Sequence, residues 1–405
     1  MQILTNKNIL IGVTGSIAIY KTLELIRLYI KAGANVKVII TKSAKKFITP
    51  LTFETISQQN ILDDENENWS KTSIDNHIAI GKWADIFLIA PASANTINKL
   101  ANGLADNILT QTALAYPKIK LIAPAANTNM LNNPITNASI KKLQLYNYKV
   151  IQSQTKELAC RDVGDGAMAE PEDIFHQTVK ELLNDEYWEN RKVVITGGGT
   201  IEKIDNVRYI SNFSSGKMAA SLATALYYKG ANVSLISTSN ISVPTQINTV
   251  QIQTSKEMLQ QTQKSLQTFE KEKKPYFFSV AAVSDFIPKI QHDGKIKKDT
   301  LGENWNLEMK KNIDILDSIN KNEIYAIGFK AEVNIQSAKK NATNMLKNKN
   351  LDAVCLNIIS EENNFGSDTN EIELIMKNNS SQIAKNTKIN VSLDIITHLK
   401  ESFNE

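Results

Sequence analysis

Cys160 raises the first chemical question in this 405-residue chain, which contains only one other cysteine, Cys355. It lies in "LACRDVGDGAMAEPEDI", between an expected helix-like segment and a loop that carries Gly164 and Gly166. Acidic residues then lead into a new helix. A lone thiol is either a small apolar plug or a reactive group on a flap over a site. The choice depends on what the rest of the chain binds.

Other side chains suited to chemistry lie in short polar segments. His77, in "DNHIAIGKWAD", has a side chain that exchanges protons near neutral pH, although a lone helix histidine is more often structural. The basic run "HDGKIKK", residues 292–298, would by itself be an ordinary solvated loop. The loops in "GVTGSIAIYK", "APASANTINKL" and "VVITGGGT" follow apolar runs, so helix N-terminal amides there could face a phosphate. The segment "SNFSSGKM" is not a Walker A loop, because it lacks the first glycine of that motif. A G-x-G-x-x-G motif does not occur either.

A weak internal repeat predicts the elements that position these residues. "NILIGVTGSIAIYKTLELIRLYIKAGANVKVIITKS" begins at Asn8, and "KVVITGGGT" begins a similar stretch at Lys192 that ends at Ser239. Each reads as a buried strand, a Gly-containing loop, an amphipathic helix and a second buried strand. Gly33 and Gly230 stand where a helix would end in the left-handed conformation. Two such units predict two α/β domains with mainly parallel, Rossmann-like sheets.

Further strand-then-loop segments follow in each half. A polar connector, Leu182–Lys192, suggests domains at 1–185 and 190–405. In open α/β sheets, ligands bind beyond the carboxyl ends of the strands, so the loops named above are the candidate sites.

Composition narrows the class of protein. A net charge of +4 is too small to suggest nucleic-acid binding. Two distant cysteines fit a reducing compartment, and no stretch approaches the roughly twenty apolar residues of a membrane span. The N-terminus enters an expected strand with no long apolar leader. We expect a cytoplasmic protein.

The first half resembles the flavin-containing cysteine decarboxylases. The resemblance lies in the segments "GVTGSIAIYK", "HIAIGKWAD", "APASANTINKL" and "GLADN". In that family, FMN is understood to oxidise the substrate's CH₂–SH arm to a thioaldehyde, so that loss of CO₂ leaves a stabilised enethiolate. The resemblance makes His77 the base, Asn127 the amide that holds the substrate carboxylate, and Cys160 the acid that protonates the enethiolate. It implies that the first domain is flavodoxin-like, with FMN contacts at Gly15, Ser16, Ala18, Thr41, Ser93, Asn95 and Thr96.

Some positions depart from the pattern of that family. The family commonly has Met where this chain has Ala126, Gly where it has Arg161, and Arg where it has Ala167. These differences concern the flap and the substrate phosphate.

The second half resembles phosphopantothenate–cysteine ligase, chiefly through "DNVRYISNFSSGKM". That family activates a carboxylate with CTP, forming an acyl-cytidylate from which cysteine displaces CMP. The resemblance places Asn212 at the acyl-cytidylate step and Lys295 at the functional lysine. It also implies CTP contacts at Ala281, Asp285, Lys295, Ile313, Asp314, Ile315, Leu316, Phe329 and Lys349, with Mg²⁺ or Mn²⁺ accompanying the nucleotide.

This half also departs from the family pattern. Ile201, Lys203, Asn206 and Ala219 are not the commonest family residues. Met345 occupies the place of a second phosphate-facing lysine, for which Lys347 could substitute.

The two resemblances in this order indicate the bifunctional enzymes of coenzyme A synthesis. They imply 4'-phosphopantothenate, cysteine and CTP as substrates, and a homo-oligomer of decarboxylase trimers and ligase dimers. The metal ligands stay unknown. Three alternatives are open: a non-catalytic flavoprotein, a flavin prenyltransferase, and a protein in which only the ligase half works.

Overall fold

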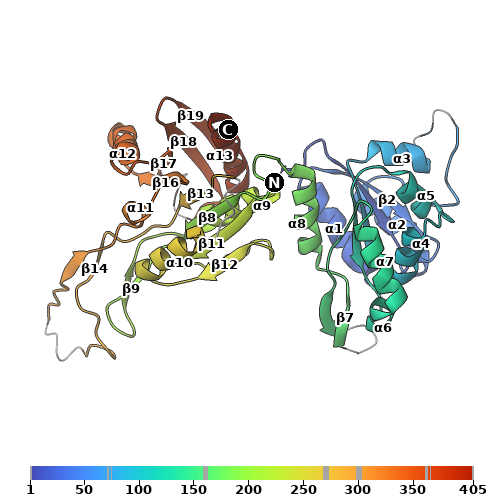
Figure 1. The fold of residues 1–405 in the computed structure, drawn as a ribbon, viewed down its shortest axis with the longest axis horizontal. Helices are drawn as coiled ribbons and strands as arrows, with labels where there is room; N and C mark the ends of the chain where they lie inside the picture. Colours follow the sequence, from blue (N-terminus) through green and yellow to red (C-terminus); the bar gives the residue numbers. More distant parts are fainter. Residues whose placement is uncertain are drawn as a thin grey trace. The chain divides into compact units, whose positions relative to one another are not determined.

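The computed structural model describes residues 2–70, 73, 75–157, 163–267, 273–297, 303–360, 364 and 366–403. The chain forms two compact units, Met1–Leu182 and Leu183–Glu405, each with its own sheet (Figure 1). The predicted fold class, α/β with mainly parallel sheets, is confirmed. No helix within these described ranges is both long and apolar enough to cross a membrane.

The first unit is built on a five-stranded parallel sheet in the order β2-β1-β3-β4-β5, the flavodoxin-like order. Its main elements are β1 (Asn8–Val13), α1 (Ile19–Lys31), β2 (Asn35–Ile40), α2 (Pro50–Ser57), α3 (His77–Trp83), β3 (Ile86–Ala92), α4 (Ala94–Ala101), α5 (Ile108–Ala115), β4 (Lys120–Pro124), α6 (Thr128–Asn132), α7 (Pro134–Gln144), β5 (Tyr148–Val150) and α8 (Pro171–Leu183).

Helices cover both faces of this sheet. On one side α1 packs against α8, where the Tyr29 hydroxyl lies 2.7 Å from the Thr178 hydroxyl. On the other side lie α4, α5 and α7 (Figure 1). Strands such as β3 are buried along their whole length, which explains why they read as continuous apolar runs.

The segment before Cys160 differs from our expectation. It is a strand, β6 (Gln154–Glu157), which pairs antiparallel with β7 (Val163–Ala167), so the predicted helix-like segment is wrong. A strand of four polar residues is too short for its side-chain pattern to be distinguished from that of a helix end. Gly164 and Gly166 lie in β7, not in a loop.

The second unit has an eight-stranded sheet in the order β12-β11-β8-β13-β16-β17-β18-β19. Its six parallel strands, numbered in chain order, run 3-2-1-4-5-6, as in dinucleotide-binding domains. The elements are β8 (Lys192–Gly197), β9 (Ile201–Lys203), β10 (Tyr209–Ser211), α9 (Lys217–Tyr228), β11 (Asn232–Ser237), β12 (Asn248–Gln251), α10 (Ser255–Gln267), β13 (Tyr276–Ser279), β14 (Phe286–Pro288), β15 (Met309–Lys311), α11 (Ile315–Ser318), β16 (Tyr325–Glu332), α12 (Ile335–Asn348), β17 (Ala353–Ile358), β18 (Thr369–Met376), β19 (Ser380–Thr387) and α13 (Lys388–Ser402).

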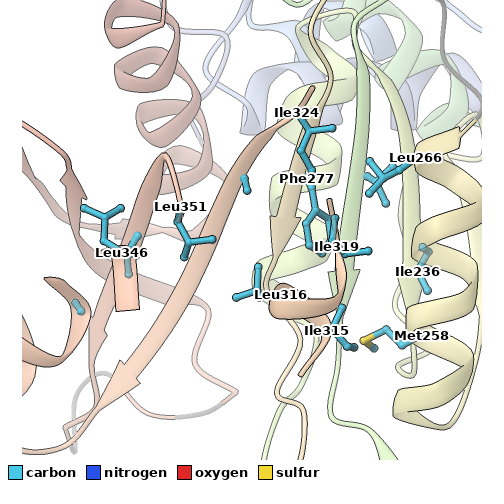
Figure 2. Close-up of a cluster of buried hydrophobic side chains, with 14 of the residues drawn as sticks. Ile236, Met258, Leu266, Phe277, Ile315, Leu316, Ile319, Ile324, Leu346 and Leu351 are labelled. Atoms are coloured by element: carbon cyan, nitrogen blue, oxygen red, sulfur yellow. The ribbon is translucent and has the colours of Figure 1, made fainter. Parts of the chain in front are cut away.

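The repeat seen in the sequence corresponds to β1-α1-β2 and β8-α9-β11. Gly33 and Gly230, just after the two helices, have φ of +91° and +92°. Both are therefore left-handed, as predicted. One core of the second unit lies between its sheet and helices α10, α11 and α12, where side chains such as Met258, Phe277 and Leu346 belong to one buried apolar cluster (Figure 2).

Candidate functional site

The first unit contains a cavity of about 1040 Å³ at the carboxyl edge of its sheet. The loops after β1, β2, β3 and β4 contribute to its lining, as the strand-end rule predicts. Most residues that the sequence suggested for this half lie there: Gly15, Ser16, Ala18, Thr41, Ser93, Asn95, Thr96 and Asn127.

The loop after β1 comes very close to the loop after β2. A Cβ atom on Gly15 would lie 2.7 Å from the Cβ of Ser43, which is closer than real Cβ contacts allow. Ser16 accepts a hydrogen bond from the Ala18 amide at 3.3 Å and so fixes the turn into α1. The absence of a side chain at position 15 therefore lets both loops border one cavity.

The ends of β1 and β3 are tied together behind the cavity. The Thr14 hydroxyl donates to the Pro91 carbonyl at 2.7 Å and accepts from the Ser93 amide at 2.9 Å. Ser93 then caps α4, accepting from the Thr96 amide at 3.3 Å. These bonds hold the hydroxyl groups of Ser93 and Thr96 at the cavity wall.

Asn127 is held by the β6–β7 hairpin as well as by its own helix. Its side chain caps α6 by accepting from the Asn129 amide at 2.9 Å. The preceding Ala126 amide donates to the Gly166 carbonyl at 3.2 Å. A Cβ on Gly166 would lie 2.0 Å from the Ala126 carbonyl oxygen. The hairpin therefore packs directly on the Asn127 loop.

Cys160 lies outside the described residues, as does Arg161. Its described flanks, β6 and β7, belong to the hairpin that packs beside Asn127. Ala167, at the end of β7, lines the cavity.

His77 is not among the described residues that line this cavity. It begins α3, and its Nδ1 lies 2.7 Å from a carboxylate oxygen of Glu67. The Trp69 ring meets the imidazole edge-on, with 4.8 Å between ring centroids. Because a carboxylate only accepts, Nδ1 carries a hydrogen and Nε2 is left as the position for proton exchange. No known spacing links Glu67 to His77, so Glu67 could not be selected from the sequence.

The cavity also has charged residues that the sequence reasoning missed. Lys21 and Lys156 both pair with Glu170, which follows β7. Burial acts to raise the pKa of Glu170, but hydrogen bonds from the two lysines lower it below the ordinary range. Lys99 pairs with Asp106 at 2.6 Å. Nothing in their spacing distinguished these residues from surface charges.

The second unit has a cavity of about 200 Å³ between the start of α9 and the strands β16, β17 and β18. Of the residues predicted to contact CTP, Ala281 and Phe329 line it. An adjacent hollow of about 470 Å³ contains Asn212, and Phe213 and Ser214 border both spaces.

The "GGGT" loop after β8 shapes these two spaces. Gly198 has φ of +80°, and a Cβ there would lie 2.1 Å from the Thr238 hydroxyl. A Cβ on Gly199 would lie 2.4 Å from the Asn212 carbonyl oxygen. Glycine is therefore needed for the close approach of the backbone at both positions.

Two asparagines hold the segment that follows β13. The Asn212 side chain donates to the Val283 carbonyl at 3.1 Å. Asn312 donates from its side chain to the Ser284 carbonyl at 2.7 Å and from its amide to the Asp285 carbonyl at 2.8 Å. Asp285 itself is exposed. The structure thus brings Asn212, Ala281 and Asp285 into one neighbourhood.

The segment from Ile313 to Leu316 divides between surface and core. Ile313 is exposed, whereas Ile315 and Leu316 point into the apolar cluster that includes Met258 (Figure 2). A nucleotide could therefore reach the last two residues only through their backbone.

Asp314 and Lys349, both predicted CTP contacts, form an ion pair with each other. Burial acts to raise the pKa of Asp314, while the Lys349 ammonium and backbone amides lower it below its ordinary value. Met345 packs toward Gly328 and belongs to the core periphery, and Lys347 is exposed.

The sequence reasoning did not assign Lys388, which lines the smaller cavity, or Lys217, which lies near Lys388. Lys388, which is 9% exposed, donates to the carbonyls of Ser367 and Thr369. Lys217 donates to the Gly366 carbonyl at 2.8 Å and pairs with Asp368. Burial, and then the neighbouring Lys217, lower the pKa of Lys388. A lysine in an otherwise ordinary helix start gave no signal in the sequence.

Comparison with known proteins assigns both units. Residues 2–183 match the family model described as "Flavoprotein". Residues 188–403 match the model "DNA/pantothenate metabolism flavoprotein C-terminal domain". Together with the two strand-end cavities, these matches define a two-domain flavoprotein of the α/β class.

Curated relatives extend over nearly the whole chain. The coenzyme A biosynthesis bifunctional protein CoaBC of Haemophilus influenzae is 36% identical over 408 residues, covering 99% of this chain and 98% of that protein. The CoaBC protein of Borreliella burgdorferi is 38% identical over 400 residues, covering 96% and 98%. A solved C-terminal domain of a CoaBC protein is 26% identical, covers 54% of this chain and 99% of its own, and has a TM-score of 0.44.

The chain belongs to the family of coenzyme A biosynthesis bifunctional proteins. It is an enzyme of coenzyme A biosynthesis, in agreement with the resemblance seen in the sequence.

Proposed function

We propose that the second unit joins 4'-phosphopantothenate to cysteine with CTP, and that the first unit decarboxylates the product to 4'-phosphopantetheine with FMN. The observation that carries the proposal is that both units of one chain have a cavity at a sheet's carboxyl edge, within a sequence similar to CoaBC proteins almost end to end. The domains proposed for the two activities are residues 1–185 and 190–405.

In the ligase step, a carboxylate oxygen of phosphopantothenate would attack the α-phosphorus of CTP and pyrophosphate would leave. The amine of cysteine would then attack the acyl carbon, losing a proton, and CMP would leave. Asn212 supports this scheme because its side chain, fixed to the Val283 carbonyl, borders the hollow next to the smaller cavity. Lys295 would stabilise negative charge as it moves between phosphate groups.

Several observations support FMN in the first cavity. Its volume of about 1040 Å³ lies at the upper end of the roughly 300–1,000 Å³ typical of ligand sites. The missing side chain of Gly15 lets the loops after β1 and β2 approach closely and border one cavity, and hydroxyl groups of Ser16, Thr41 and Ser93 supply neutral donors. FMN, when bound, would supply the electron sink that decarboxylation of a thiol-bearing acid requires.

The chain's own residues would bind and protonate the substrate of the decarboxylase. The Asn127 amide would hold the substrate carboxylate without adding a positive charge that resists its departure. His77 would accept a proton from the thiol through Nε2, because Glu67 occupies Nδ1. Cys160 would return a proton to the enethiolate.

Mg²⁺ or Mn²⁺ is proposed with CTP. The described residues contain no group of three or more His, Cys, Asp or Glu side chains placed to hold a metal. This arrangement suits a magnesium ion held chiefly by nucleotide phosphates and water. The metal ligands are therefore not assigned to particular residues.

An assembly of copies, built from decarboxylase trimers and ligase dimers, is also proposed. The position of His77 away from the lining of its own chain's cavity supports flavin sites near subunit contacts. A cytoplasmic location is proposed from the two widely spaced cysteines, of which Cys355 is a buried free thiol.

Separate assays of the two steps test the proposal. Pyrophosphate release should require phosphopantothenate and prefer CTP over ATP, and equal use of both nucleotides would contradict the cytosine preference. A Cys160→Ser variant should keep its flavin and stall before 4'-phosphopantetheine forms. Yellow protein that never releases CO₂ would instead indicate a non-catalytic flavoprotein.

A further inference from the structure

The loop that carries Lys295 is joined to the turn between β9 and β10. The His292 amide donates to the Ile204 carbonyl at 2.9 Å, and the Asn206 amide donates to the Gly294 carbonyl at 3.2 Å. Strands β9 and β14, which lead into these two segments, lie side by side in the second unit (Figure 1). The basic loop is therefore not an independent solvated segment.

Asp205 connects the turn to the loop through both oxygens of its carboxylate. Oδ1 accepts from the amides of Val207 and Arg208, each at 2.7 Å. Oδ2 accepts from the Ile296 amide at 3.2 Å and from Nη1 of Arg208 at 3.3 Å. Asp205 is only 1% exposed, and an aspartate is rarely buried to this extent unless it is paired in this way.

The charge of Asp205 is maintained by these contacts. Burial acts to raise the pKa of Asp205, but hydrogen bonds from the Val207, Arg208 and Ile296 amides lower it below its ordinary value. The carboxylate is therefore ionised at neutral pH, and its hydrogen bonds are of the stronger, charge-assisted kind.

These contacts hold the backbone on both sides of Lys295. Before it, the Gly294 carbonyl is bonded to Asn206; after it, the Ile296 amide is bonded to Asp205. Nη2 of Arg208 also donates to the Ile296 carbonyl at 3.4 Å. Lys295 stands between two fixed residues with an exposed side chain.

We propose that Asp205 is a positioning residue of the ligase, which fixes the backbone at Lys295 so that its ammonium group meets the nucleotide phosphates in one geometry. The proposal rests on the function proposed for Lys295. Preorganised charges need no rearrangement when the transition state forms, so a fixed backbone should increase the rate of the step more than the affinity for CTP.

The variant Asp205→Asn separates the two halves of this contact. Its amide oxygen can still accept from Val207 and Arg208, whereas its NH₂ group would face the Ile296 amide, so two donors would oppose each other. We expect the ligase kcat to fall about ten- to hundredfold, with a smaller change in KM for CTP. Hydrogen exchange at the Ile296 amide should become faster. CO₂ release from supplied 4'-phosphopantothenoylcysteine should not change.

Asp293→Asn is the matched control, because it removes an equal charge from the same loop at an exposed position. Its ligase rate should stay within about twofold of the original. The decisive comparison is Asp205→Asn alone, Lys295→Gln alone, and the two together, measured as pyrophosphate release. If Asp205 acts through Lys295, the Asp205→Asn substitution should have almost no further effect on the rate once Lys295 is replaced.

The outcomes distinguish the inference from the proposed function. An equal loss in both backgrounds, or no loss with Asp205→Asn, would overturn the positioning role while leaving the ligase assignment intact. A Lys295→Gln variant as active as the original would overturn the role of Lys295, and the inference with it.

A second variant tests the same point if Asp205→Asn does not fold. Gly294 has φ of +77°, and a Cβ there would meet no described atom within 4 Å. Gly294→Ala therefore strains the loop backbone without touching Asp205. It should lower the ligase kcat several-fold through Lys295. Full activity would show that the loop geometry does not matter.

Discussion

Replacing Gly166 with alanine should separate the β6–β7 hairpin from the Asn127 loop. The new Cβ would lie 2.0 Å from the Ala126 carbonyl oxygen and 3.1 Å from the Thr128 amide nitrogen. Both are backbone atoms and cannot turn aside, so the hairpin must move. Overpacking of this kind costs about 1–3 kcal/mol, which corresponds to a shift of about fivefold to more than a hundredfold between packed and displaced hairpins.

The assay is decarboxylation of 4'-phosphopantothenoylcysteine, followed as CO₂ release, with the pyrophosphate assay as an internal reference. We expect kcat for decarboxylation to fall by a factor in that range while the ligase rate is unchanged. Gly103→Ala is the control: unlike Gly166, Gly103 has a left-handed φ of +68°, so alanine there strains the backbone, but its Cβ meets nothing within 4 Å. An unaltered decarboxylase in Gly166→Ala would refute the idea that hairpin packing positions the reacting groups.

Three further predictions concern side chains that hold these sites together. Glu67→Gln should lower the decarboxylation rate about tenfold and change its pH profile, because the amide no longer fixes the His77 tautomer; Glu65→Gln, at an exposed residue, should change neither. The ion pairs of Glu170 lower its pKa from the ordinary 4.5, so their stabilisation is complete above pH 4.5 and is lost as the pH falls through the lowered pKa. Denaturant unfolding measured between about pH 3 and pH 6 should show this loss of stability. In Glu170→Gln this pH-dependent loss should be absent. Lys388→Met should cost about 1–3 kcal/mol of unfolding free energy because two carbonyls lose their buried donor, whereas stability equal to the original protein would show that the loop needs no such support.

The sequence was most informative about the sheets and the loops at their carboxyl ends. Buried strands such as β3 read clearly because parallel strands covered on both faces are apolar throughout. Gly33 and Gly230 could be identified as helix ends because few other residues adopt positive φ there.

The sequence was least informative where a site depends on long-range contacts. Glu67, ten residues before His77, and Asp205, ninety-one residues before Ile296, have no local pattern that marks their partners. Strand β7 was misread as a loop because its glycines suggested one. In the structure, Gly166 is required instead by close packing against Ala126.

The segment around Asp314 in the second unit also has contacts that the sequence did not predict. Resemblance selects the segment as a whole, but it does not say which side chains face solvent. The structure buries Leu316 and pairs Asp314 with Lys349. Such a division follows from the packing of α11 against the core, which no single stretch of sequence records.

The most direct test of the whole account uses cysteine labelled in its carboxyl carbon. Purified protein supplied with FMN, Mg²⁺, 4'-phosphopantothenate and this cysteine should release labelled CO₂ only after CTP is added, with one pyrophosphate for each CO₂. This result requires both units to act in series on one substrate. Pyrophosphate formation with no labelled CO₂, from protein that also fails to take up FMN, would contradict the account.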